Sequence, residues 1–233
     1  MPEESEELQS SPFAFYAFYQ LHRHLRVTPV SRLSFQDILR ELYPDYIMKP
    51  GREKEKTSLF ITWEKQGAGG SGDFELRGCI GTFARPPLLK GIERYSLIAA
   101  LQDDRFPPIR KGELPRLRCS CNILHNFTTI YKRSKPDGDI FDWEIGVHGI
   151  ELKFEDPDTG RILSATFLPE VMPEQGWDKQ ETFQALVEKA GFCRDISQLM
   201  DSYDEYFVEV LRYEGDKSAI AYEEFSRLLE QVV

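Results

Sequence analysis

Hydrophobic residues recur at intervals of three to four in several segments, and this spacing predicts amphipathic helices. The first begins at Ser11 and Pro12, an N-cap and a first-turn proline, and the others follow Ser34, Pro87 and Asp178. Another helix is expected from about residue 219. The expected buried positions are Ala14, Phe18, Leu21 and Leu25; Ile38, Leu39 and Leu42; Leu88, Ile92, Tyr95 and Ala99; and Phe183, Leu186, Val187 and Ala190.

Hydrophobic and polar residues alternate in the segments between these helices, which predicts strands. The first two, joined by the glycine-rich turn of residues 67–73, form a hairpin. Because hairpins occur together with strand–helix–strand sequences, we predict an α+β fold, a mixed sheet with flanking helices. One strand is expected to start at residue 58. The other expected strands span residues 74–83, 117–123, 143–148, 150–155, 161–168 and 206–211.

The 233 residues suffice for one cooperative domain with a sizeable core. We expect an acidic leader at 1–10, one domain at 11–233, and a peripheral insertion at about 27–57. No apolar run approaches the roughly 20 residues that cross a bilayer, and the start lacks a signal-peptide pattern. We therefore expect no membrane association, and a cytoplasmic or nuclear location.

The formal charge of −10 disfavours direct nucleic-acid binding, which needs local Lys and Arg excess. The densest basic cluster, between residues 105 and 118, is interrupted by Asp103, Asp104 and Glu113. It is either a phosphate site or a solvated mixed-charge surface. Its basic members are Arg105, Arg110, Lys111, Arg116 and Arg118.

Residues 76–83, LRGCIGTF, carry the most distinctive local pattern. Glycine weakens a strand, so Gly78 and Gly81 imply either a closely packed second segment or a bulge that redirects Arg77 and Cys79. The Lys-Ser or Lys-Thr of a P-loop and the third glycine of a dinucleotide fingerprint are missing. The pattern therefore marks a functional surface without indicating nucleotide binding.

Four segments occur in an order that resembles the AMMECR family: LRGCIGTF, DDRFPPI, WEIGVHGIEL and LPEVMPEQGWDKQETFQALVEKAGF. The resemblance covers roughly residues 11–26 and 58–230. It implies a compact α/β fold of two packed subdomains around a shared cleft, with no particular reaction. Members of this family also occur alongside Memo-like and radical-SAM proteins. The resemblance therefore implies a Memo-like protein as an expected partner.

The resemblance assigns site residues by position. The signature is Leu76, Arg77, Gly78, Cys79, Ile80 and Gly81; the later blocks are Arg105, Phe106, Pro107 and Pro108; Gly146, His148 and Gly149; and Glu174, Gln175, Gly176 and Trp177. We expect these motifs to form a cleft that recognises a small anionic ligand or a partner segment. Its ligand-binding residues would be Arg77, Gly78, Gly81, Arg105, Glu174 and Trp177.

Two other functions stay open. Cys79 could be the nucleophile of an enzyme with His148 or His125 as base, or a small buried residue. The third class is a nuclear, nucleic-acid-associated regulator. Arg77 could clamp an anion or form a structural ion pair.

Metal and cofactor chemistry receive little support from the sequence. Cys119, Cys121 and His125 share strand parity, which fits a metal site or a core-facing strand. We expect the core-facing strand, and neither a metal nor a cofactor. His22 and His24, on the first helix, are expected to face solvent or cap carbonyls.

Overall fold

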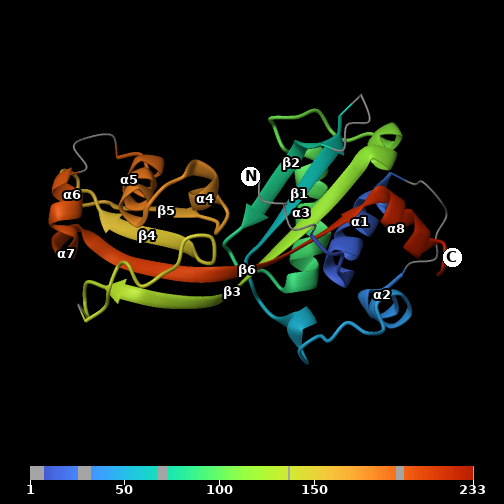
Figure 1. Ribbon diagram of the computed structural model, residues 1–233, viewed down its shortest axis with the longest axis horizontal. Helices are drawn as coiled ribbons and strands as arrows, with labels where there is room; N and C mark the ends of the chain where they lie inside the picture. The colour runs from blue at the N-terminus through green and yellow to red at the C-terminus, as the bar shows by residue number, and fades with distance from the viewer. Residues whose placement is uncertain (1–7, 26–32, 68–72, 136, 193–196, 233) are drawn as a thin grey trace, which may run out of the picture. The chain divides into compact units, whose positions relative to one another are not determined.

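The computed structural model describes residues 8–25, 33–67, 73–135, 137–192 and 197–232, and it confirms the predicted α+β class (Figure 1). The strands form one sheet in the order β2-β1-β3-β6-β4-β5. β1 pairs antiparallel with β2 and β3, and β4 pairs antiparallel with β5 and β6. The strands are β1 (Leu59–Gln66), β2 (Phe74–Thr82), β3 (Leu117–Lys132), β4 (Gly149–Glu155), β5 (Ile162–Phe167) and β6 (Phe207–Ala221).

Helices accompany the sheet in both halves of the chain. The α-helices are α1 (Pro12–His24), α2 (Phe35–Leu42), α3 (Leu88–Leu101), α4 (Val171–Gln175), α5 (Lys179–Lys189), α6 (Ser197–Asp201), α7 (Tyr203–Tyr206) and α8 (Tyr222–Leu229). Two 3-10 helices, η1 (Arg52–Lys54) and η2 (Lys111–Arg116), lie in the connections. No helix in the described ranges is both long and apolar enough to span a membrane.

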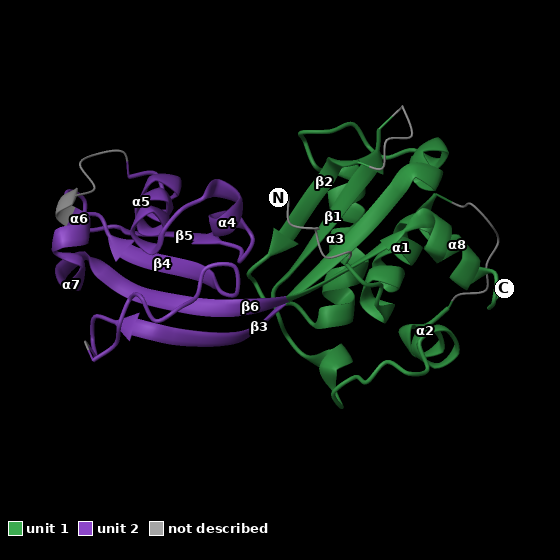
Figure 2. Cartoon of the chain, viewed as in Figure 1, with its two compact units in different colours: residues 1–123, 216–233 green, residues 124–215 purple. Residues whose placement is uncertain are grey.

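The chain divides into two compact units (Figure 2). Unit 1 comprises residues 1–123 and 216–233, and unit 2 comprises residues 124–215. β3 passes from unit 1 into unit 2 after Ile123, and β6 returns to unit 1 after Gly215. Each unit has its own hydrophobic core.

The core of unit 1 is built around α1, which is buried from Pro12 to His22. The ring of Phe18 lies 5.1 Å from Trp63 of β1 and 4.5 Å from Phe225 of α8, measured between centroids. A helix that is apolar on all sides fits such a central position. The expected single buried stripe was therefore too narrow, and the prediction that His22 faces solvent is wrong.

Part of the expected insertion at 27–57 also belongs to this core. Ser34 caps α2 in a capping box with Asp37, which fixes the start of the helix. Phe35 is buried and stacks on Phe13 of α1 at 5.1 Å. α2 therefore packs through its apolar face on the central helix.

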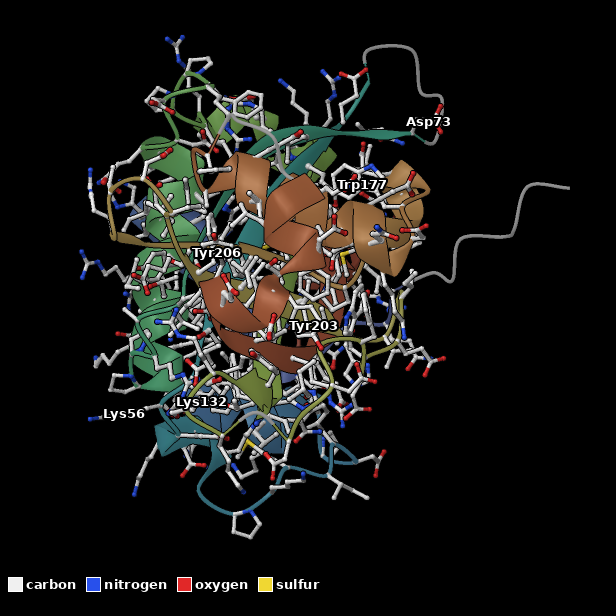
Figure 3. The ribbon with its side chains drawn as sticks, turned by 90° about the vertical axis from the view of Figure 1, so that its left-hand side faces the viewer. Lys56, Asp73, Lys132, Trp177, Tyr203 and Tyr206 are labelled. Atoms are coloured by element: carbon white, nitrogen blue, oxygen red, sulfur yellow. The ribbon has the colours of Figure 1, made fainter. Side chains whose placement is uncertain are left out.

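The core of unit 2 lies between its strands and α5. Phe154, Phe183 and Phe207 are fully buried there. Asp178 caps α5 at the predicted start of this helix, in a capping box with Glu181. α7 lies at the end of unit 2 where β6 begins, marked by Tyr203 and Tyr206 in Figure 3.

The strand predicted at residues 143–148 is wrong. Gly146 has a φ of +82°, and the backbone N–H of His148 donates to the Glu144 carbonyl at 2.9 Å, which closes a turn. The neighbouring strand predictions are confirmed as β4 and β5, but the last strand is longer than predicted. β6 therefore extends to Ala221, and the terminal helix begins only at Tyr222.

Candidate functional site

A β-bulge at Arg77 interrupts the pairing of β1 with β2. Trp63 faces Gly78, but the next residue, Glu64, faces Leu76, so Arg77 has no opposite residue. A bulge leaves one residue unpaired and redirects its side chain. The bulge that the glycine pattern suggested is therefore present, and it releases Arg77 from the ladder.

The Arg77 side chain reaches η2, where it binds Glu113. Its Nε and Nη2 donate to the two carboxylate oxygens at 3.0 and 3.2 Å, and Lys65 Nζ donates to the same carboxylate at 2.7 Å. Burial raises the pKa of Glu113, but the bonds from Arg77 and Lys65 outweigh it and lower the pKa to about 2. Only 11% of the Arg77 side chain is exposed.

This arrangement makes Arg77 a structural ion-pair member. Glu113 occupies Nε and Nη2, and the remaining nitrogen, Nη1, is buried without a hydrogen-bond partner among the described residues. Glu113 also accepts from the backbone N–H of Arg110 at 2.9 Å. The geometry therefore favours a structural ion pair over an anion clamp as the role of Arg77, and this ion pair holds η2 against β2.

Gly78 and Gly81 are required because other groups approach closely. A Cβ on Gly78 would lie 2.1 Å from the backbone oxygen of Ala99 in α3. A Cβ on Gly81 would lie 2.2 Å from the Phe60 ring and 2.5 Å from the Leu59 oxygen. Both glycines therefore allow neighbouring groups to pack closely against β2. This packing explains their presence without any contact to a ligand.

Asp103 and Arg105 cap the outer edge of β2 at Cys79. The Cys79 N–H donates to Asp103 Oδ2 at 2.8 Å, and its carbonyl accepts from Arg105 Nη2 at 3.1 Å. Arg105 Nε and Nη2 also donate to the Asp103 carboxylate at 2.9 and 2.7 Å. The two side chains thus replace a neighbouring strand at this position.

The two members of this pair differ in exposure. The Asp103 side chain is 2% exposed, whereas 52% of the Arg105 side chain is exposed. Hydrogen bonds from Arg105 hold the pKa of Asp103 well below its ordinary range, although burial opposes this. Asp103 therefore stays ionised and fixes a guanidinium that reaches solvent.

Cys79 lies in a row of polar side chains across three strands. Cys79 faces Thr62, and Thr62 faces Ser120, so the three share one face of the sheet. Cys79 Sγ lies 3.2 Å from Thr62 Oγ1. In the adjacent row Asn122 is buried, and its Oδ1 has no hydrogen-bond partner in the part of the chain that the structure describes. The half-buried Cys79 thiol therefore has the uncharged Thr62 hydroxyl as its neighbour on this face, while Asp103 and Arg105 bind its backbone.

The other predicted site residues lie in unit 2. His148 accepts the backbone N–H of Glu144 through Nδ1 at 3.0 Å. Trp177, labelled in Figure 3, lies between α4 and α5, with its ring 5.3 Å from Phe167. Glu174 is exposed on α4, and Gly146 approaches Pro173 of the same helix. The VHG and EQGW motifs therefore both belong to unit 2, while LRGCIGTF and RFPP belong to unit 1.

The remaining cysteines fit the core-facing interpretation. Cys119 and Cys121 are fully buried, and burial raises the pKa of Cys121 to about 12. No three His, Cys, Asp or Glu residues in the described ranges are grouped so that they could hold a metal ion. Cys193 lies outside these ranges.

Sequence reasoning missed the acids that organise this site. Asp103 and Glu113 were interpreted only as interruptions of a basic cluster, yet they anchor Arg105 and Arg77. Arg118 of the same cluster pairs with Glu64 at 2.8 Å. The alternation of acids and bases was the available signal, because it is typical of paired charges.

The chain is similar to proteins from fungi and archaea. The AMMECR1 family model matches residues 24–217. An uncharacterised protein of Saccharomyces cerevisiae is 57% identical over 230 residues, 96% of this chain and 90% of that protein. One of Kluyveromyces lactis is 49% identical over 96% of both chains. The crystal structure of an uncharacterised Pyrococcus horikoshii protein matches with a TM-score of 0.58 and 21% identity over 89% of both chains, a likeness of fold.

Proposed function

Because the chain belongs to the AMMECR1 family, whose matched relatives carry no named activity, we propose its function from the site: unit 1 binds a small anionic ligand or anionic partner segment at Arg105. The observation that carries this proposal is the fixed, half-exposed guanidinium beside Cys79. Its bonds to Asp103 and Cys79 use Nε and Nη2, and no described residue bonds to Nη1, which is left for a ligand. A guanidinium held in place loses little entropy when it binds an anion.

The proposal assigns different roles to the two arginines. Arg105 contacts the ligand, whereas Arg77 acts as a positioning residue through Glu113. Gly78 allows β2 to approach α3 closely enough for Asp103 to reach the Cys79 N–H. Glu174, Trp177 and a Memo-like partner stay predictions, as does the cytoplasmic or nuclear location.

Removal of Arg105 is expected to abolish stabilisation by anions. At ten times its dissociation constant a ligand adds about 1.4 kcal/mol to the free energy of unfolding, which is about 3–5 °C in Tm for a chain of this size. We expect inorganic phosphate or succinate to raise the Tm of the wild type, and Arg105→Ala to lose that rise. Thermal unfolding followed by circular dichroism measures both.

Arg110→Ala is the matched control, because Arg110 is an exposed arginine of the same segment and its side chain has no ion pair among the described residues. It should retain the anion effect. An equal rise in Tm in Arg105→Ala and the wild type would show that Arg105 is not the anion site. Mass spectrometry of metabolites retained by the wild type and lost by Arg105→Ala would then identify the natural ligand.

A Cys79-dependent enzyme is the second candidate, and the half-buried thiol beside Thr62 and Arg105 favours it. In a Cys193→Ser background, iodoacetamide should modify Cys79 before the fully buried Cys119 and Cys121. Peptide mapping across pH gives the rate at each cysteine. A Cys79 rate that is already constant below pH 7 supports a catalytic thiolate, whereas a rate that only rises through the ordinary thiol range near pH 8.5 argues against one.

A further inference from the structure

The sheet ends in two edge strands, β2 and β5, which differ in how their outer edges are covered. The Asp103–Arg105 pair caps β2 at Cys79, as described above. On β5, the Asp156 N–H donates to the Arg161 carbonyl, and the same register places Phe154 opposite Leu163. In an antiparallel pair, every second residue directs its backbone N–H and C=O groups toward the partner strand. Residues 161, 163 and 165 therefore bond on the β4 side, and the residues between them direct these groups away from β4.

The outward-directed residues of β5 are Ile162, Ser164 and Thr166. Lys189 Nζ donates to the Thr166 carbonyl at 2.8 Å, which caps one end of the edge. Within the described residues, no partner is seen for the outward backbone groups of Ile162 or Ser164. The edge of β5 is therefore open at these two residues. The distance between them is one repeat of the hydrogen-bond pattern of an antiparallel ladder.

Side chains along this edge are open as well. Ile162 is 55% exposed, the highest value among the large hydrophobic residues of unit 2 in the described ranges, and Ser164 is exposed. Leu163 and Ala165 face the other way and pack against the core of unit 2. An added strand would therefore find an apolar side chain beside free backbone groups, the arrangement used in strand addition.

Charge indicates which strand this edge would accept. Unit 2 contains nineteen Asp and Glu residues against nine Lys and Arg, whereas unit 1 contains twenty of each, so unit 2 accounts for the whole formal charge of −10. Asp156 and Asp158 lie in the turn beside Ile162 together with Arg161. Lys153, opposite Ser164, is paired with Glu209, and Lys189 caps Thr166. A second copy of this chain would bring two such acidic units together, which like-charge repulsion disfavours.

We propose that the β5 edge binds an extended, basic segment of a partner protein by strand addition. The Ile162 and Ser164 backbone groups supply the ladder bonds, and the exposed Ile162 side chain packs against an apolar residue of the added strand. The negative field of unit 2 attracts the segment's lysines and arginines and favours them over acidic segments. This surface is separate from the Arg105 site and does not depend on it.

The test uses the isotope-labelled full chain and an acetylated, amidated hexapeptide of alternating lysine and valine. We expect amide shifts concentrated at residues 162–166, and affinity that falls with salt. Ser164→Pro removes an outward N–H that β4 does not use, which an edge strand tolerates, and should weaken binding at least tenfold. Ser164→Thr keeps the N–H and should bind within twofold of the wild type. Circular dichroism checks that both variants are folded.

Three results would overturn the proposal. The first is equal affinity of Ser164→Pro and the wild type, and the second is equal binding of the corresponding glutamate–valine peptide. The third is a wild-type dimer, detected by light scattering, that is absent in Ser164→Pro. Such a dimer would identify a second copy of the chain as the occupant of the β5 edge. A backbone N-methylated lysine–valine peptide keeps the charge but loses ladder bonds, so its failure to bind would support strand addition.

Discussion

Gly78→Ala is expected to destabilise the protein by about 3 kcal/mol, the upper end of the usual range for overpacked substitutions. The new Cβ would lie 2.1 Å from the Ala99 carbonyl oxygen, and that oxygen belongs to the backbone of α3. A flexible side chain could move aside, but here β2 or α3 must shift. Urea denaturation measures the loss, and the Tm should fall by about 6–12 °C.

Gly112→Ala is the control for this substitution. Gly112 lies in η2, where an added Cβ meets nothing within 4 Å. It should change the free energy of unfolding by no more than about 0.5 kcal/mol. If Gly78→Ala stayed within 1 kcal/mol of the wild type, the close approach of β2 to α3 would not be a constraint in solution.

Asp103→Ala is expected to cost about 3 kcal/mol, in the range for breaking a buried charge pair. The substitution removes the acceptor of the Cys79 N–H and three bonds from Arg105. Arg105 is half exposed, so water can solvate its guanidinium again and the cost stays below the upper limit for such pairs. Chemical denaturation measures this cost, and Asp104→Ala, the exposed neighbour, should be close to neutral.

The same carboxylate makes stability depend on pH. The pKa of Asp103 in the folded protein is below its ordinary value, so its contribution is complete above about pH 4 and is lost as the pH falls. Asp103→Asn should therefore show a smaller loss of stability between pH 4 and pH 2 than the wild type. Glu113, with a pKa lowered to about 2, adds to the wild-type loss and remains in the variant. Equal slopes for the two proteins would contradict the role assigned to Asp103.

The sequence was most informative where local signals determine structure. The N-cap residues Ser34 and Asp178 and the alternation around Trp63 led to the correct helices and strands. At residues 143–148 alternation failed, because Gly146 adopts a left-handed conformation that closes a turn instead. Hydrophobic periodicity contains no information about the sign of φ.

The site was harder to predict because its contacts join segments far apart in sequence. The glycines of LRGCIGTF indicated close packing or a bulge, and the structure contains both. Nothing local to Arg77 indicates that its carboxylate partner is Glu113, 36 residues away. The same holds for Asp103 and Cys79, which are 24 residues apart. Pairing charges across such distances requires the fold.

The discontinuity of unit 1 bears on how the protein is made. Residues 216–233 leave the ribosome after the whole of unit 2, yet they supply Phe225, which packs on Phe18 of the central helix. The Ala219 N–H also donates to the Gln9 carbonyl at 3.1 Å, which joins a segment made after unit 2 to one made before it. Unit 2, a continuous stretch, can fold during synthesis, whereas unit 1 must keep its apolar helix α1 incompletely covered until residues 216–233 have been made.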